Sequence, residues 1–88
     1  MPEDAFEAEW REFFMRGESI AIDGTPEAQI TIASLYKNGI GVLKDIEKAM
    51  YWYTKAAEAG LVEAQYLLGE LYYRYLIMNE NSKQKAVN

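Results

Sequence analysis

The sequence predicts an all-α fold built from helix-turn-helix repeats, and three observations support this prediction. The sequence GTPEAQ at residues 24–29 recurs 36 residues later as GLVEAQ at residues 60–65. Apolar residues at helical spacing recur at the same distance: Ile32, Leu35 and Tyr36 become Leu68, Leu71 and Tyr72. Asn38 and Gly39 separate two of these helical segments, as is typical of a helix end. A fixed period of this length is typical of a solenoid of stacked repeats.

The composition indicates one small folded domain. Of the 88 residues, 50% are hydrophobic and 14% are aromatic, which is ample material for a core at this length. The sequence has no cysteine and no histidine. Disulfides and thiolate metal sites are therefore excluded, and the commonest general base is absent. We expect a single repeat domain over residues 1–88, with no bound cofactor and no metal site.

The charge pattern argues against two classes of partner. The formal net charge is −5, and residues 1–27 carry eight acidic side chains against two basic ones. Because contacts to phosphate supply most non-specific affinity for nucleic acid, we expect no nucleic-acid binding. No run of about 18 apolar residues is present, so we expect no membrane insertion. The acidic start has no basic and apolar leader, which favours the cytoplasm; a signal that has been removed is the alternative.

The first predicted helix covers residues 3–22. Acidic side chains in its first turn suit the positive end of the helix dipole. Gly17 lowers helix propensity in the middle and predicts a bend. The apolar residues that recur at helical spacing, and are expected to face the core, are Phe6, Trp10, Phe13, Phe14 and Ile20.

The second and third predicted helices have clear ends. Thr25 is a candidate N-cap, Pro26 fits the first helical position, and Gly39 can adopt the left-handed conformation that stops a helix. Gly39 and Gly41 then predict a tight turn, which lacks the third glycine of a nucleotide-binding loop. Asp45 is expected to cap the third helix, which ends at Gly60 and places these residues on one side: Ala49, Trp52, Tyr53 and Ala56.

The fourth predicted helix repeats the second, with an inner face formed by Ala64, Leu68, Leu71 and Tyr72. Tyr75 occupies the position equivalent to Gly39, so this helix is expected to continue to about Met78. The polar residues 79–82 predict a break. Ser82 is then expected to cap a last short turn over residues 83–87.

The repeat resembles a known family. Residues 28–60 follow the pattern AQxxIAxxYxxGxGVxxDxxKAxxWxxKAAxxG, which is similar to a Sel-one-like repeat, a relative of the tetratricopeptide repeats. The resemblance implies antiparallel helix-turn-helix repeats that form a short right-handed α-solenoid. It divides the chain into a complete repeat at 24–60 and a second, truncated repeat at 61–88. Residues 1–23 keep little of the pattern and are interpreted as a diverged capping helix.

The resemblance also implies a protein-interaction module, an adaptor or scaffold. In helical-hairpin solenoids the first helix of each repeat lines the concave side, and some of its positions stay free. We predict that a peptide or protein segment binds these positions on the second and fourth helices, with Leu67 as an apolar anchor. This interaction strip consists of Thr31, Ser34, Lys37, Asn38, Leu67, Glu70, Tyr73 and Arg74. Tyr73 and Arg74 are of residue types enriched at binding hot spots. Plain solvated surface is the alternative for the strip.

A second candidate surface lies at the truncated repeat. A repeat needs neighbours to bury its faces, so apolar side chains here are expected to promote self-association as a homodimer, or to bind another partner. The residues concerned are Leu71, Tyr75, Leu76 and Met78. Two other readings stay open: a fragment of a longer array with a structural role, and an enzyme or small-molecule binder. The absence of histidine and of a GxSxG motif argues against the enzyme.

Overall fold

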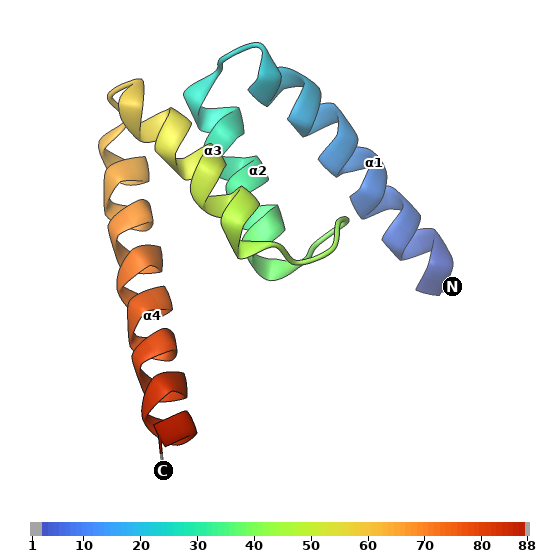
Figure 1. The fold of residues 1–88 in the computed structure, drawn as a ribbon. Helices are drawn as coiled ribbons and strands as arrows, with labels where there is room; N and C mark the ends of the chain where they lie inside the picture. Colours follow the sequence, from blue (N-terminus) through green and yellow to red (C-terminus); the bar gives the residue numbers. More distant parts are fainter. Residues whose placement is uncertain (1–2, 88) are drawn as a thin grey trace.

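The computed structural model consists of four α-helices that pack in chain order (Figure 1). It describes the backbone of residues 3–87 and the side chains of residues 7–80. Each helix packs on the next, α1 on α2, α2 on α3 and α3 on α4, and no strand occurs within residues 3–87. The predicted all-α repeat fold is confirmed. The helices are α1 (Glu3–Ile22), α2 (Pro26–Asn38), α3 (Ile46–Glu58) and α4 (Val62–Val87).

α1 is one continuous helix, and Gly17 does not interrupt it. A Cβ at Gly17 would lie 3.1 Å from Cδ1 of Ile32, so the missing side chain allows α1 to approach α2 closely. Phe13 and Ile20, which were expected in the core, are exposed because α2 covers only one side of α1. Phe6 lies outside the described side chains. The side of α1 that packs inward contains Trp10, Phe14, Gly17 and Ala21.

The predicted ends of α2 and α3 are confirmed, except that the side chain of Thr25 does not cap α2. Gly39 has φ +68° and its N–H donates to the carbonyl of Leu35, which caps α2. The side chain of Asp45 accepts a hydrogen bond from the N–H of Lys48 at 3.0 Å, which caps α3. Thr25 has an extended N-cap backbone, but its side chain makes no capping hydrogen bond. Pro26 follows it in the first turn, where a missing N–H costs nothing.

The repeated glycine and glutamine form the same junction twice. Gly24 (φ +100°) and Gly60 (φ +94°) turn the chain after α1 and after α3. The N–H of Gly24 and Nε2 of Gln29 both donate to the carbonyl of Ala21, at 3.0 and 3.2 Å. In the second copy, Gly60 and Gln65 donate to the carbonyl of Ala57, at 3.0 and 3.4 Å. This shared hydrogen-bond pattern explains why GTPEAQ recurs as GLVEAQ.

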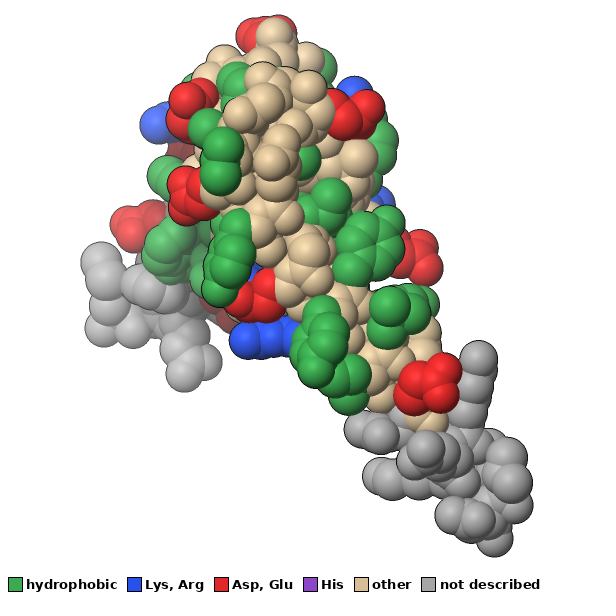
Figure 2. Space-filling model, turned by 90° about the vertical axis from the view of Figure 1, so that its left-hand side faces the viewer, with side chains coloured by type: hydrophobic (Ala, Val, Ile, Leu, Met, Phe, Trp, Pro, Cys, Tyr) green, Lys and Arg blue, Asp and Glu red, His purple; other side chains and the backbone are tan. Residues whose placement is uncertain are grey.

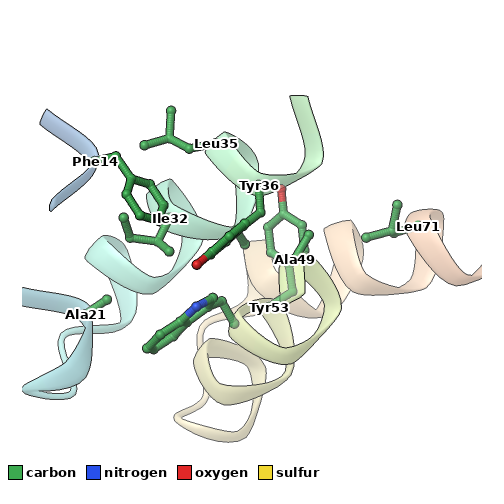
Figure 3. Close-up of a cluster of buried hydrophobic side chains, with 10 residues drawn as sticks. Phe14, Ala21, Ile32, Leu35, Tyr36, Ala49, Tyr53 and Leu71 are labelled. Carbon is green, nitrogen blue, oxygen red and sulfur yellow. The ribbon is translucent and has the colours of Figure 1, made fainter. Parts of the chain in front are cut away.

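The core is formed by side chains from all four helices, with Leu71 contributed by α4 (Figure 3). Ile32 and Tyr53 are its largest fully buried side chains. The rings of Phe14 and Tyr36 meet edge to face, with centroids 5.1 Å apart. The hydroxyl of Tyr36 donates to Oε2 of Glu18 at 3.3 Å. Burial of the Tyr36 phenol, together with the negative charge of Glu18, raises the pKa of Tyr36 above its ordinary value of 10.0.

α4 is longer than predicted. It is a single helix from Val62 to Val87, so the predicted break at residues 79–82 is wrong. That stretch contains neither glycine nor proline, and polar side chains on a solvated helix do not disrupt its backbone hydrogen bonds. α4 has 26 residues and α3 has 13. At about 1.5 Å per residue, α4 therefore extends roughly 20 Å past the antiparallel α3, and Figure 1 shows its last turns with no helix beside them.

Candidate protein-interaction surface

The α2 half of the interaction strip is only partly free. Thr31 and Asn38 are exposed, and Lys37 is half-buried. The hydroxyl of Thr31 donates to the backbone carbonyl of Glu27 at 3.1 Å. Ser34 is half-buried, and its Oγ lies 2.9 Å from the hydroxyl of Tyr53 in a hydrogen bond. Because Tyr53 is buried, its hydroxyl needs this partner, so Ser34 stabilises the α2–α3 contact and is not a free surface group.

The α4 half of the interaction strip contains an ion pair and an exposed tyrosine. Nη2 of Arg74 lies 3.3 Å from Oε1 of Glu70, one turn earlier. Arg74 and Tyr73 are exposed and Glu70 is half-buried. Leu67 is partly buried against the core, so the interpretation of Leu67 as a free apolar anchor is wrong. It lies on the side of α4 that neighbours the buried Leu71, since the two are four residues apart.

The two halves are related by the repeat and not by direct contact. Asn38 and Arg74 stand 36 residues apart, near the middle or end of the first helix of each repeat, and both are exposed. Among the described side chains, no hydrogen bond or ion pair joins the α2 half to the α4 half. Their polar groups are an amide, a guanidinium and a phenol. Such groups donate to backbone carbonyls and carboxylates, which suits an extended peptide.

The structure leaves some residues of the second candidate surface available for a partner and buries one of them. Leu71 is buried in the core cluster with α3, so it is unavailable for self-association. Tyr75, Leu76 and Met78 are exposed, as that prediction requires. Tyr72 was expected in the core but is exposed, because it lies in the wall of an open groove between α3 and α4. Figure 2 shows hydrophobic side chains spread along this face of α4.

Two grooves lie outside the predicted sites. A groove of about 750 Å³ separates the start of α1 from the turn after α2 and is lined by Glu7, Trp10, Arg11 and residues 39–43. A groove of about 340 Å³ lies between α3 and α4, with Met50, Tyr51 and Tyr72 in its walls. The sequence did not indicate either groove, because each is formed by residues from two elements.

The described residues contain no cluster of three or more acidic side chains that could hold a metal ion. Within the same part of the chain, none of the helices has the length and apolar character needed to cross a membrane. The arrangement is therefore one of packed helices with polar and aromatic surface groups.

Comparison with known proteins agrees with the geometry. The model of the Sel1 repeat matches residues 26–61 and residues 62–87. The two matches begin with the first residues of α2 and α4, and the second lies entirely within α4. A putative sel1-like repeat-containing protein, L21, from Acanthamoeba polyphaga mimivirus is 39% identical over 61 residues.

That alignment covers 69% of this chain but 10% of the viral protein, so the chain spans about a tenth of its relative's length. No solved structure matches the chain. Sel1 repeats are typically protein-interaction modules. From two consecutive matches, a shared helical repeat and a related sequence, the chain belongs to the Sel1 repeat family.

Proposed function

We propose that this chain is a protein-interaction module, acting as an adaptor or scaffold, that binds a peptide or protein segment along the interaction strip of α2 and α4. The observation that carries the proposal is the exposure of Asn38 and Arg74 at equivalent positions of two consecutive repeats. Equivalent groups at repeated positions can follow a partner that is itself extended. Membership of a family of interaction repeats supports the same role.

Each exposed group has a defined task in this proposal. The Asn38 amide pairs with a peptide group of the partner, since it has both donors and an acceptor. Arg74, oriented by its ion pair with Glu70, donates hydrogen bonds to a carboxylate or backbone carbonyl of the partner. Tyr73 contributes apolar area with little loss of conformational entropy. Ser34 and Leu67 hold the strip in position, because Ser34 hydrogen-bonds to Tyr53 and Leu67 packs against the core.

The test begins with peptides selected from a random display library against the 88-residue chain. The affinity of a selected peptide is then measured by calorimetry for the chain and for Asn38→Ala and Arg74→Ala. We expect each variant to lose about tenfold or more in affinity, because tenfold corresponds to about 1.4 kcal/mol and truncation of a hot-spot side chain typically costs about 2 kcal/mol or more.

Arg16→Ala is the matched control, because Arg16 forms the same kind of exposed ion pair, with Glu12 one turn earlier. We expect it to bind the peptide normally. Leu43→Glu tests the groove beside α1, which Leu43 lines. Loss of binding in Leu43→Glu but not in Asn38→Ala or Arg74→Ala would move the binding site to that groove and overturn the proposal.

A further inference from the structure

α1 and α3 occupy equivalent places in the repeat. α3 packs on two helices, α2 on one side and α4 on another, whereas α1 packs on α2 alone. α3 packs on α2 through a buried side that contains Ala49, Tyr53 and Ala56, and Tyr53 bonds to Ser34 of α2. The positions 36 residues before Ala49 and Ala56 are Phe13 and Ile20. These two side chains are 49% and 51% exposed. On the side of α1 equivalent to the α2-binding side of α3, Phe13 and Ile20 are therefore apolar and exposed. Gly17, at the place of Tyr53, already packs near Ile32 of α2, and the charged Arg16 stands at the place of Trp52.

α4 has the complementary property. α2 is covered on two sides, by α1 and α3, whereas α4 is covered by α3 alone. Ala33 of α2 is buried, but the equivalent Gly69 of α4 is exposed. The exposed residues on the uncovered side of α4 recur at helical spacing, and we call them the bare stripe: Tyr66, Gly69, Tyr73 and Leu76.

The two uncovered sides fit each other in size. Ala33 of α2 and Ala49 of α3 are both fully buried in the core cluster. At the equivalent places, α4 has Gly69 and α1 has Phe13. A Cβ on Gly69 would have no other atom within 4 Å. Gly69 has no side chain and lies between the exposed Tyr66 and Tyr73, so a phenylalanine ring from a second helix can approach the backbone of α4 there.

Charge favours pairing of α1 with α4 over pairing of α1 with itself. α1 contains six acidic and two basic residues, a net charge of −4. α4 contains three of each sign and is neutral. Two copies of α1 side by side would repel each other, whereas α1 beside α4 would not.

We propose that a second copy of this chain packs against the bare stripe of α4 through the side of its α1 that contains Phe13 and Ile20. The α1 of that copy then lies against α4 in the way that α3 lies against α2. The contact joins two different surfaces, so each copy keeps one free stripe and one free α1 side. Copies therefore associate head to tail, and the assembly grows without closing at a dimer. Asn38 and Arg74 are not part of this contact, but Tyr73 belongs to both the interaction strip and the bare stripe, so a docked copy and a bound peptide compete for this side chain.

The test uses sedimentation velocity and light scattering over about a hundredfold range of protein concentration, since mass action governs a reversible contact. The native chain is expected to increase in average mass beyond the dimer as concentration rises. Phe13→Glu, which blocks the α1 side, and Gly69→Glu, which blocks the stripe, are each expected to remain monomeric. Both positions are exposed; Phe13→Glu removes an edge-to-face contact with the ring of Trp10, and circular dichroism verifies that both variants are folded.

Mixing the two variants distinguishes this contact from others. Phe13→Glu retains a free stripe and Gly69→Glu retains a free α1 side, so their mixture should form a one-to-one dimer and nothing larger. Met15→Glu, an exposed position on the other side of α1, is the control that should still assemble. A monomeric native chain at the highest concentration, continued association of Phe13→Glu alone, or a mixture that stays monomeric would each overturn the proposal. Phe13→Glu leaves every residue of the interaction strip unchanged and should still bind peptides selected on it, so the two proposals fail separately.

Discussion

At the scale of single residues, the glycines of the repeat perform two different tasks. Gly24 and Gly60 supply a positive φ where the chain turns, and a Cβ on either would have no other atom within 4 Å. Gly41 also has a positive φ, +75°, but here a Cβ would overlap the backbone carbonyl group of Trp10 in α1. The turn after α2 can therefore touch α1 only while residue 41 has no side chain.

This difference predicts unequal costs for two identical substitutions. Gly24→Ala should lower the free energy of unfolding by about 1 kcal/mol, the cost of a left-handed backbone for a residue with a side chain. Gly41→Ala should lower it by roughly 3 kcal/mol or more, because the overlap with Trp10 adds to the same backbone cost. Urea denaturation of both variants measures the difference. Equal losses would show that the contact of Gly41 with α1 contributes nothing.

Several residues are buried or exposed in the structure contrary to the prediction from the repeat pattern. Ser34 and Leu67 occupy positions that the repeat pattern left free, yet Ser34 bonds to Tyr53 and Leu67 packs on the core. Phe13 and Tyr72 occupy positions that the pattern assigned to the core, yet both are exposed. Periodicity specifies which side of a helix a residue is on. Whether that side is covered depends on the neighbouring helices.

At the scale of elements, α2 and α3 follow their local signals and α4 does not end where expected. The signals for α2 are Pro26 and Gly39, and that for α3 is Asp45, each of which acts within one turn of its helix. α4 has Tyr75 in place of the terminating glycine and continues through the polar residues to Val87. In the second Sel1 match, a single helix therefore spans the stretch that in the first match contains α2, a turn and α3.

A proline inside the predicted break tests this continuity. Asn81→Pro removes a backbone donor and places the ring against the carbonyl of Ile77, so the end of α4 should lose its helix. We expect the helical circular dichroism signal to fall by about a tenth, the share of the chain beyond this point, with little change in the unfolding midpoint, because the core of α4 ends at Leu71. Asn81→Ala is the control and should keep the full signal. An unchanged signal in Asn81→Pro would mean that α4 already ends before residue 81.

At the scale of the whole molecule, the chain is open and flat. Its Cα radius of gyration is 15.2 Å, and its principal extents are 46 × 38 × 15 Å. A compact domain of this length would have a radius of gyration of about 12 Å. The difference arises because each helix contacts its neighbours in sequence, and the end of α4 extends past α3 (Figure 1).

Small-angle scattering of the Phe13→Glu variant, at low concentration where it is monomeric, tests this shape. We expect a radius of gyration close to 15 Å, well above the roughly 12 Å of a compact domain. A value near the compact limit would show that α4 folds back on the other helices and covers its own bare stripe. That result would also contradict the head-to-tail contact, which needs the stripe to be open.

The sequence by itself determined the repeat, the family, the helical class, and the starts and ends of α2 and α3. These depend on signals that act within one turn or recur at a fixed period, so neighbouring residues suffice to read them. The tertiary structure decided that Leu71 is buried and Tyr72 exposed, that Ser34 supports Tyr53, and that Phe13 and Gly69 lie on uncovered sides. The physical reason is that burial belongs to pairs of helices. α2 has a helix on each of two sides and α4 on one, and no spacing within α4 encodes that difference.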